Sequence, residues 1–351
     1  MKDLTIGFIG LGLIGGSIAR GIKRSRRDVR IMAYMRSRDK LEQAKRDGVV
    51  DVILDGIGEE ISWCDLVFLC TPVEYNASYL EQIRPLLKPG ALVTDVGSTK
   101  TDIHETVKRL GMEEVFVGGH PMAGSEKTGY ENSTDHLLEN AYYMITPTEK
   151  STPEQIGRIR RVALSIGAIP MVTDYRQHDF SVAAVSHLPH LVASSLVNLV
   201  RDNDNEEELM RTIAAGGFKD ITRIASSSPV MWEQICMTNT ENIKVLLRRY
   251  IQSLETIYEE LDRRDGSSIH RTGGHQMGPS PATAAAPWPR IIPLPWISWT
   301  NLAPFPLWPC SWPPRALTSR TSASTIAGKR ARALSGSPFI TRTPKPGPMS
   351  C

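Results

Sequence analysis

Short, uninterrupted apolar runs alternate with amphipathic stretches through the first half of the chain. The apolar runs lie at residues 4–10, 29–35, 65–72 and 91–98, with further candidates at 115–120, 142–148 and 169–173. Helical spacing is found at residues 13–24, 37–47, 75–87 and 100–110. Strands that read as continuous apolar runs are buried on both faces of a parallel sheet, in which every connection needs a crossover helix. The pattern therefore predicts an α/β domain with a parallel-rich sheet over residues 1–173.

The second half of the chain changes to helical periodicity alone, and we expect an all-α domain over residues 174–265. Its last apolar stripe runs from Ile243 to Leu261 in alternating steps of four and three residues. A stripe with this spacing is typical of a helix that faces its own core, and also of a helix that packs against a second subunit. We expect the chain to form a homodimer through this domain.

Residues 266–351 differ in composition from everything before them. They hold no Asp or Glu, nine Lys or Arg, 15 of the 24 prolines and five of the seven tryptophans, whereas residues 1–265 carry 32 basic and 38 acidic side chains. Proline at this density breaks helices and central strands, so we expect an irregular, disordered tail. A basic patch for nucleic acid is one interpretation. The interpretation that we favour is a frameshift near residues 265–270, which resequencing of the gene would test.

The remaining composition is that of a soluble protein with two domains. The chain has 351 residues, of which 41% are hydrophobic. No N-terminal stretch has the order of a signal peptide, and no run of 18 apolar residues could span a bilayer, so we expect a cytoplasmic protein without membrane contact. The five cysteines lack metal-ligand spacing and are expected to fill the core or to be incidental thiols.

A glycine-rich loop (GLGLIG) follows the first apolar run. In this GxGxxG pattern Gly10 makes a tight turn, Gly12 lets the backbone approach a pyrophosphate, and Gly15 lets the helix pack on the strand. The N-terminus of the following helix offers unpaired N–H groups to the phosphates. We therefore predict a Rossmann-type domain that binds NAD or NADP, with Leu13 and Ile14 in the same site. A purely structural glycine turn is the alternative.

The residues after the second apolar run bear on the choice between NAD and NADP. An NAD enzyme usually has an acidic residue there, which binds the ribose 2′-hydroxyl, but this chain has Arg36 and Ser37. An arginine beside a hydroxyl suits a 2′-phosphate. Stacking on the adenine, or simple solvation of Arg36, is the alternative, and the choice stays open. Thr71 and Pro72, which end the third run, are also assigned to the cofactor site.

Polar segments follow several of the apolar runs, at residues 95–100, 118–126 and 186–190. Because open α/β sheets bind ligands at the carboxyl ends of their strands, Ser98 and His120 are expected to face a bound nicotinamide. A histidine there can act as a general base near neutral pH, although a loop histidine without function is the alternative. His178, His187 and His190 have no carboxylate or cysteine near them at a spacing typical of metal ligands, so we expect no bound metal. We interpret these three residues as hydrogen-bonded histidines at helix ends.

Charged side chains also cluster within residues 216–225 (GGFKDITRIA). A lone arginine in an all-helical domain usually lies on a solvated face. Beside Lys219 and Asp220, however, Arg223 could be held so that its guanidinium binds a carboxylate of an anionic substrate.

Taken in order, the motifs GLGLIGGS, DVGSTK, VGGHPMAGSEKTG, HD at 178–179, VSHLPH and GGFKDITRIA resemble the prephenate dehydrogenase family, from residue 4 to about 262. The resemblance implies oxidative decarboxylation of prephenate to 4-hydroxyphenylpyruvate, a step of tyrosine biosynthesis. It implies that His120 takes the proton of the ring hydroxyl, that Ser98 assists this hydroxyl and orients the nicotinamide, and that Arg223 binds a substrate carboxylate. The residues implied to line or gate the pocket are Ser125, Glu126, His187 and His190, and the supporting residues are Asp179, Trp232, Lys219 and Asp220.

Some bacterial members of this family continue past the helical domain with a regulatory ACT domain, of a size similar to residues 266–351. These residues show none of its alternating strands. A frameshift there would remove feedback regulation by tyrosine.

Three other functions compete with this one. Arogenate dehydrogenase uses the same kind of site on the amino analogue of prephenate. A β-hydroxyacid dehydrogenase would be expected to use a lysine base on a helix, and His120 in a GGHPMAG loop argues against it. A non-catalytic dinucleotide sensor with a basic, nucleic-acid-binding tail is the alternative of another class. We expect the enzyme, with prephenate as its substrate and no nucleic-acid partner.

Overall fold

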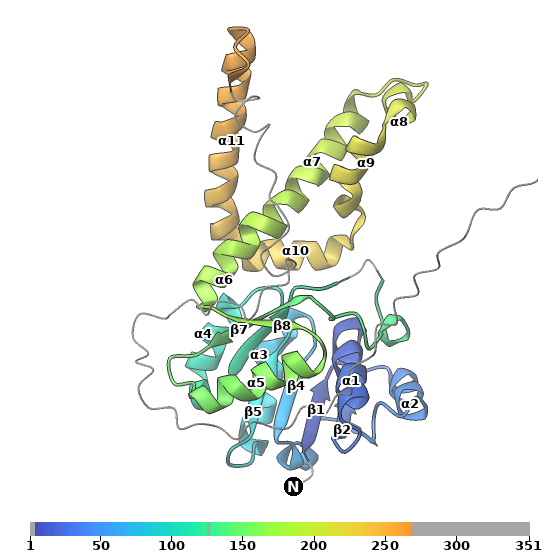
Figure 1. Ribbon diagram of the computed structural model, residues 1–351, viewed down its shortest axis with the longest axis vertical. Helices are drawn as coiled ribbons and strands as arrows, with labels where there is room; N and C mark the ends of the chain where they lie inside the picture. Colours follow the sequence, from blue (N-terminus) through green and yellow to red (C-terminus); the bar gives the residue numbers. More distant parts are fainter. Residues whose placement is uncertain (1–3, 125–126, 268–351) are drawn as a thin grey trace, which may run out of the picture. The chain divides into compact units, whose positions relative to one another are not determined.

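The first half of the chain folds as a five-stranded parallel sheet, in the spatial order β3-β2-β1-β4-β5 (Figure 1). This computed structural model describes residues 4–124 and 127–267, so the predictions on Ser125, Glu126 and the tail beyond residue 267 lie outside the described residues. The strands are β1 (Thr5–Ile9), β2 (Arg30–Tyr34), β3 (Val52–Ile53), β4 (Leu66–Leu69) and β5 (Leu92–Asp95). The helices between them are α1 (Leu13–Ser25), α2 (Arg38–Arg46), α3 (Val73–Ile83) and α4 (Thr101–Arg109). The predicted Rossmann-type order is confirmed, and of the five strands in this sheet only the short β3 was not expected.

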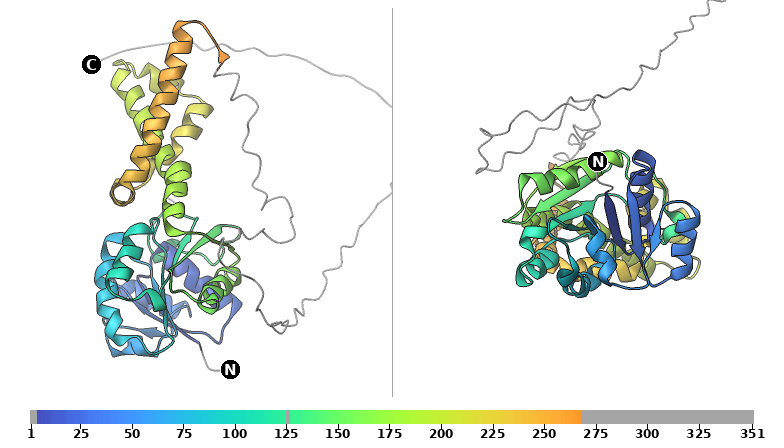
Figure 2. Two further views of the ribbon diagram at one scale, coloured as in Figure 1. Left: turned by 90° about the vertical axis from the view of Figure 1, so that its left-hand side faces the viewer. Right: turned by 90° about the horizontal axis from the view of Figure 1, so that it is seen from below.

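Neighbouring side chains of one strand pack into two different hydrophobic clusters, one on each face of the sheet. This explains why the strands are continuous apolar runs in the sequence. In β4, Leu66 and Phe68 pack into a cluster with α1 and α5 residues, while Val67 and Leu69 pack into a second cluster with α3 and α4 residues. Figure 2 shows α3 and α4 on one side of the sheet and α1 and α5 on the other. Side chains alternate between the faces of a strand, so a sheet covered on both faces needs apolar residues at every position.

A second sheet of three strands, β6 (Val117–Pro121), β7 (Tyr142–Pro147) and β8 (Ile169–Val172), follows the first. Strand β7 is antiparallel to β6 and parallel to β8. A single parallel bridge between Val93 and Phe116 joins this sheet to β5. The C-terminal end of β6 therefore points the same way as that of β5, which places the two predicted catalytic segments at one edge.

Helix α5 (Pro153–Ser165) crosses from β7 to β8 and was not among the expected elements. Its start could have been found in the sequence. The Thr152 hydroxyl accepts from the Gln155 amide, the Gln155 side chain accepts from the Thr152 amide, and Pro153 begins the helix. This is the reciprocal capping box, with proline at the position where no amide donor is needed.

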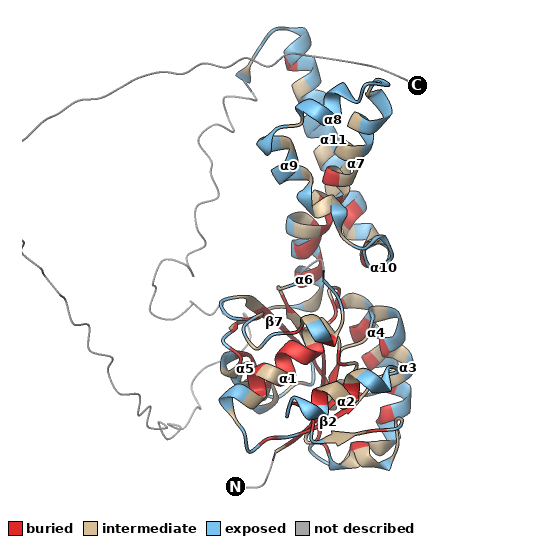
Figure 3. Cartoon of the chain, turned by 90° about the vertical axis from the view of Figure 1, so that its right-hand side faces the viewer, coloured by how far each residue is buried: buried red, intermediate tan, exposed pale blue. Residues whose placement is uncertain are grey.

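All described elements after β8 are helical, as expected. They are α6 (Tyr175–Val182), the π-helix η5 (Ala183–His187), α7 (Leu188–Asn203), α8 (Leu209–Ile213), α9 (Gly216–Thr222), the 3₁₀-helix η6 (Arg223–Ser226), α10 (Pro229–Thr238) and α11 (Thr240–Asp262). Further 3₁₀ turns in the first half are η1 (Glu59–Trp63), η2 (Arg84–Leu86), η3 (Glu113–Val115) and η4 (Tyr130–Asn132). Much of α7, α8, α9 and α11 is exposed in the single chain (Figure 3).

Helices α6, η5 and α7 form one continuous helix, Tyr175–Asn203. The π-turn precedes Pro189, which has no amide donor and cannot close an ordinary helical bond. By length and composition alone this helix is apolar enough to cross a membrane, a test that core helices also pass. Its first turns carry the buried Asp179, which is hydrogen-bonded to residues of the dinucleotide domain. That part of the helix is therefore packed against protein.

Candidate active site

The loop from Gly10 to Gly15 has the geometry that a pyrophosphate requires. Gly10 has φ +89°, and a Cβ there would lie 2.6 Å from the Cys70 carbonyl oxygen. A Cβ on Gly15 would lie 2.7 Å from the Gly10 oxygen, so the helix could not pack this closely on the loop. A Cβ on Gly12 would meet no atom within 4 Å, which leaves open space at the N-terminus of α1. The first turn of α1 has no acidic residue, so its free N–H groups favour an anion.

The other predicted cofactor residues surround this loop. Leu13 and Ile14 begin α1. Arg36 is exposed at the end of β2, with its guanidinium carbon 5.6 Å from the centre of the Tyr75 ring. Ser37 precedes α2 but makes no capping hydrogen bond. The Thr71 hydroxyl donates to Asn76 at 2.9 Å, and Pro72 is the N-cap of α3.

A buried ion pair holds the backbone immediately before His120. The Lys100 ammonium binds the Asp95 carboxylate, and neither side chain has any exposed area. Lys100 also donates to the Gly119 carbonyl at 2.7 Å, while Asp95 accepts from the Gly119 and Gly97 amides at 3.2 and 2.8 Å. Neither Lys100 nor Asp95 was predicted from the sequence to belong to the site. Together they fix β6 against β5 at the carboxyl edge of the sheets.

His120 itself is half-buried and is hydrogen-bonded to another histidine. Its Nδ1 lies 2.9 Å from His178 Nε2, and His178 Nδ1 lies 2.8 Å from Asp179 Oδ1. Burial is the largest cause that lowers the pKa of His120 well below its usual value, and the nearby charge of Lys100 acts in the same direction. The ring is therefore neutral at pH 7 and can accept a proton. Ser98 is half-buried in the turn after β5, the strand that Asp95 ends.

Asp179 joins α6 to the dinucleotide domain. Its Oδ1 accepts from the Lys100 amide at 2.8 Å, and its Oδ2 accepts from the Thr101 amide and hydroxyl at 2.8 and 2.6 Å. These bonds satisfy donors at the N-terminus of α4 that have no partner within the helix. The Asp179 carbonyl oxygen accepts from the side chain of Asn239 at 2.7 Å. The supporting role implied for Asp179 thus has a definite geometry, whereas Asn239 carried no sequence signal that we recognised.

The remaining histidines of the VSHLPH segment pack with Trp232. His190 stacks on the Trp232 ring with centroids 3.7 Å apart, and His187 meets the same ring edge-on at 6.1 Å. His187 Nδ1 lies 3.1 Å from the Asn239 amide nitrogen. Burial is the main cause that lowers the pKa of His187 to about 4. His190 Nδ1 and Trp232 Nε1 are buried without a hydrogen-bond partner in the described part of the chain.

The predicted carboxylate-binding site at Arg223 is less ordered than the sequence suggested. Lys219 and Asp220 lie in α9 and Arg223 begins η6, and all three are exposed. Among the described residues, no hydrogen bond or ion pair joins these side chains to one another. In a single chain, Asp220 and Lys219 therefore do not hold Arg223.

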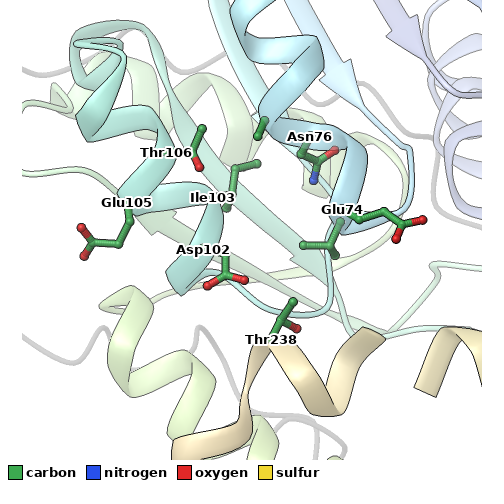
Figure 4. A pocket seen from close by; sticks show the side chains of 9 residues that line it. Glu74, Asn76, Asp102, Ile103, Glu105, Thr106 and Thr238 are labelled. Carbon is green, nitrogen blue, oxygen red and sulfur yellow. The ribbon is translucent and has the colours of Figure 1, made fainter. Parts of the chain in front are cut away.

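A cavity of about 350 Å³ lies between α3, α4 and α10 (Figure 4). Its lining residues are Val73, Glu74, Asn76, Ala77, Asp102, Ile103, Glu105, Thr106 and Thr238. It includes neither His120 nor Ser98. Carboxylates in its wall, such as Glu74 and Asp102, repel anions, so it suits neither a pyrophosphate nor a substrate with two carboxylates.

No group of three or more His, Cys, Asp or Glu side chains lies close enough to bind a metal within residues 4–124 and 127–267. The histidines interpreted as helix-end residues are indeed hydrogen-bonded or stacked. His178, however, bonds to His120 rather than to a helix end.

Two family models match the chain in succession. The nucleotide-binding domain of prephenate dehydrogenase matches residues 18–172, and the dimerization domain of prephenate dehydrogenase matches residues 174–273. The prephenate dehydrogenase of Bacillus subtilis (strain 168) is 36% identical over 273 residues, which are 77% of this chain and 73% of that protein. The cyclohexadienyl dehydrogenase of Zymomonas mobilis is 30% identical over 266 residues, 75% of this chain and 90% of that protein.

Solved structures give the same result. The prephenate dehydrogenase from A. aeolicus, in complex with hydroxyphenyl propionate and NAD+, has a TM-score of 0.70 and 32% identity, and covers 75% of this chain and 92% of its own. The Synechocystis arogenate dehydrogenase has a TM-score of 0.69 and 31% identity, with 77% and 96% covered.

Proposed function

The chain belongs to the prephenate dehydrogenase family, and on this premise we propose that it catalyses the NAD(P)+-dependent oxidative decarboxylation of prephenate to 4-hydroxyphenylpyruvate. The observation that carries the proposal is His120, which is kept neutral and half-buried at the carboxyl edge of the sheet. A neutral imidazole in such a place can take a proton from a substrate hydroxyl.

Each residue of the site has a definite part in this chemistry. A bound nicotinamide supplies the hydride acceptor. His120 takes the proton of the ring hydroxyl as the hydride leaves, and Ser98 assists this hydroxyl and helps to orient the nicotinamide. Arg223 binds a substrate carboxylate, His187 and His190 line the pocket, and Trp232 supports these two rings. Loss of carbon dioxide then makes the ring aromatic, which renders the reaction irreversible.

The pyrophosphate of the cofactor binds at Gly12 and the first turn of α1. The open space over Gly12 and the lack of acidic residues there support this assignment. Both NAD+ and NADP+ are compatible with the residues present, since Arg36 is exposed where the 2′ position would lie.

A test of the proposal is an assay of the full chain with prephenate and with arogenate, each with NAD+ and NADP+. We expect prephenate to be oxidised faster. The similarity to the Synechocystis arogenate dehydrogenase makes arogenate the second candidate substrate. His120→Asn should lower kcat about 10²- to 10⁴-fold, the usual contribution of a general base, and should keep its affinity for the reduced cofactor. A near-normal kcat in this variant would remove His120 from the role.

We further propose a homodimer formed through the helical domain. The match to a dimerization domain and the exposed apolar residues of α11 support this assembly. Cytoplasmic residence stays a prediction from the sequence.

A further inference from the structure

We propose that His178 is a positioning residue that selects the tautomer of His120, so that the lone pair of His120 Nε2 faces the substrate hydroxyl. The inference rests on the proposed function, in which His120 is the base. Three residues share this task through two hydrogen bonds. Asp179 fixes the position of the proton on His178, and His178 fixes that of the proton on His120.

The carboxylate end of this series, Asp179, is completely buried. Burial by itself would raise the pKa of Asp179, but hydrogen bonds from His178, Thr101 and two backbone amides offset it and hold the pKa below its usual value. The carboxylate is therefore ionised and can only accept hydrogen bonds. All of its bonds agree with this, because backbone amides of Lys100 and Thr101 are obligatory donors.

The proton positions follow in order from this carboxylate. Since Asp179 Oδ1 accepts, the 2.8 Å contact requires a proton on His178 Nδ1. In a neutral His178 ring, Nε2 then carries a lone pair. The 2.9 Å contact to this lone pair requires a proton on His120 Nδ1. A neutral His120 ring must therefore carry its lone pair on Nε2, the atom that is free to face a substrate.

The surroundings keep this arrangement from changing. His178 is only 1% exposed, so water cannot replace either of its partners. Its backbone position is set by Asp179, which is bonded to α4 and also, through its carbonyl oxygen, to Asn239. His120 is held from the other side, because Lys100 and Asp95 bind the neighbouring Gly119.

The same two hydrogen bonds stabilise the protonated form of His120 during the reaction. When Nε2 takes the hydroxyl proton, the positive charge spreads to Nδ1–H, which donates to His178. That bond becomes charge-assisted and therefore stronger. In the serine protease triad, an aspartate fixes the tautomer of the adjacent histidine in a comparable way; here a second imidazole separates the carboxylate from the base.

The test compares two substitutions of His178 in the full chain. His178→Leu removes the acceptor for His120 Nδ1–H, whereas His178→Gln can place an amide oxygen near the position of the lost Nε2. We expect His178→Leu to lower kcat about 10- to 100-fold, the usual effect of removing a residue that orients a functional side chain. KM and the affinity for the reduced cofactor should change little. His178→Gln should recover most of kcat.

A direct readout separates positioning from stability. In ¹⁵N-histidine-labelled protein, the His120 signals, identified by their loss in His120→Asn, should show a proton on Nδ1 and none on Nε2. In His178→Leu the Nε2–H tautomer should appear. His104→Leu is the matched control, because His104 is also buried but bonds to Thr146. That variant should be destabilised without a change of the His120 tautomer.

Two results would overturn the inference: a parent protein whose His120 carries its proton on Nε2, or a His178→Leu variant that keeps both its tautomer and its kcat. If the parent oxidised neither prephenate nor arogenate, the proposed function would fail, while the tautomer measurement would still decide the inference. If His178→Leu did not fold, the parent tautomer and His178→Gln would decide it.

Discussion

Lys100 and Asp95 form an ion pair from which water is completely excluded, directly behind the strand that carries His120. Burial lowers the pKa of Lys100, and the charge and hydrogen bond of Asp95 oppose that shift. The charge of Lys100 thus depends on its contact with Asp95.

Lys100→Met should destabilise the protein by about 3–5 kcal/mol, because it leaves the Asp95 carboxylate buried without its partner. Urea unfolding monitored by circular dichroism measures the change. The double variant Lys100→Met/Asp95→Asn should recover part of the loss. Lys244→Met is the control, since Lys244 and Glu241 form an exposed pair worth at most about 1 kcal/mol. Equal losses in Lys100→Met and Lys244→Met would contradict the prediction.

The free energy of unfolding should rise with pH between about pH 3 and 6.5 because of His104. Burial, followed by the charge of Lys100, lowers the pKa of His104 to about 3 from the usual 6.5. Between pH 3 and 6.5 the unfolded chain binds one more proton at this residue than the folded chain. The free energy of unfolding therefore gains about 1.4 kcal/mol per pH unit from this group as pH increases, and loses it on acidification.

His104→Gln removes this titration and should make the pH dependence less steep by that amount. Urea unfolding of parent and variant at pH 6, 5 and 4 gives the two slopes. Identical slopes would show that His104 titrates normally in the folded protein.

Arg36→Ala should lower the ratio of kcat/KM for NADP+ to that for NAD+ by about tenfold or more, because a charged hydrogen-bond pair contributes about 1.5–3 kcal/mol. Steady-state kinetics with both cofactors measures the ratio. Arg38→Ala is the matched control, since Arg38 is already bound to Asp55. An unchanged ratio in Arg36→Ala would mean that Arg36 only stacks, as its contact with Tyr75 allows.

Arg223→Ala should raise the KM for prephenate about 10- to 100-fold with a smaller change in kcat, because a guanidinium that binds a carboxylate contributes mainly to substrate binding. Initial rates over a range of prephenate concentrations separate the two effects. Arg211→Ala should leave KM unchanged, since this exposed arginine is paired with Glu208. A KM in Arg223→Ala equal to that of the parent would exclude Arg223 as the residue that binds a substrate carboxylate.

Leu254→Asp should convert the proposed dimer into a monomer. Leu254 is 45% exposed and Leu261 59% exposed on the α11 stripe of the single chain, and a buried carboxylate would oppose burial of this stripe against a partner. Sedimentation velocity gives the assembly state. Glu255→Ala, one residue away from the stripe, should remain dimeric. A dimer that survives Leu254→Asp would place the interface elsewhere.

Local patterns in the sequence were sufficient for the Rossmann-type order, the loop from Gly10 to Gly15, and the placement of Ser98 and His120 at strand ends. The spacing of apolar residues indicates which face of a strand or helix is buried, and glycines mark unusual backbone conformations. Both signals are local, so they can be recognised without knowledge of tertiary contacts. Helix α5 was missed although its capping box is equally local.

The tertiary structure alone decided which distant side chains meet. His178 follows His120 by 58 residues, and its period and neighbours indicated only a helix end. Lys100 is normally a surface residue type, and only the packing of β6 on β5 buries it against Asp95. Such contacts depend on how whole elements pack and leave no local periodicity. The sequence by itself therefore determined the domain type and the candidate base, and the tertiary structure determined what holds that base and sets its protonation.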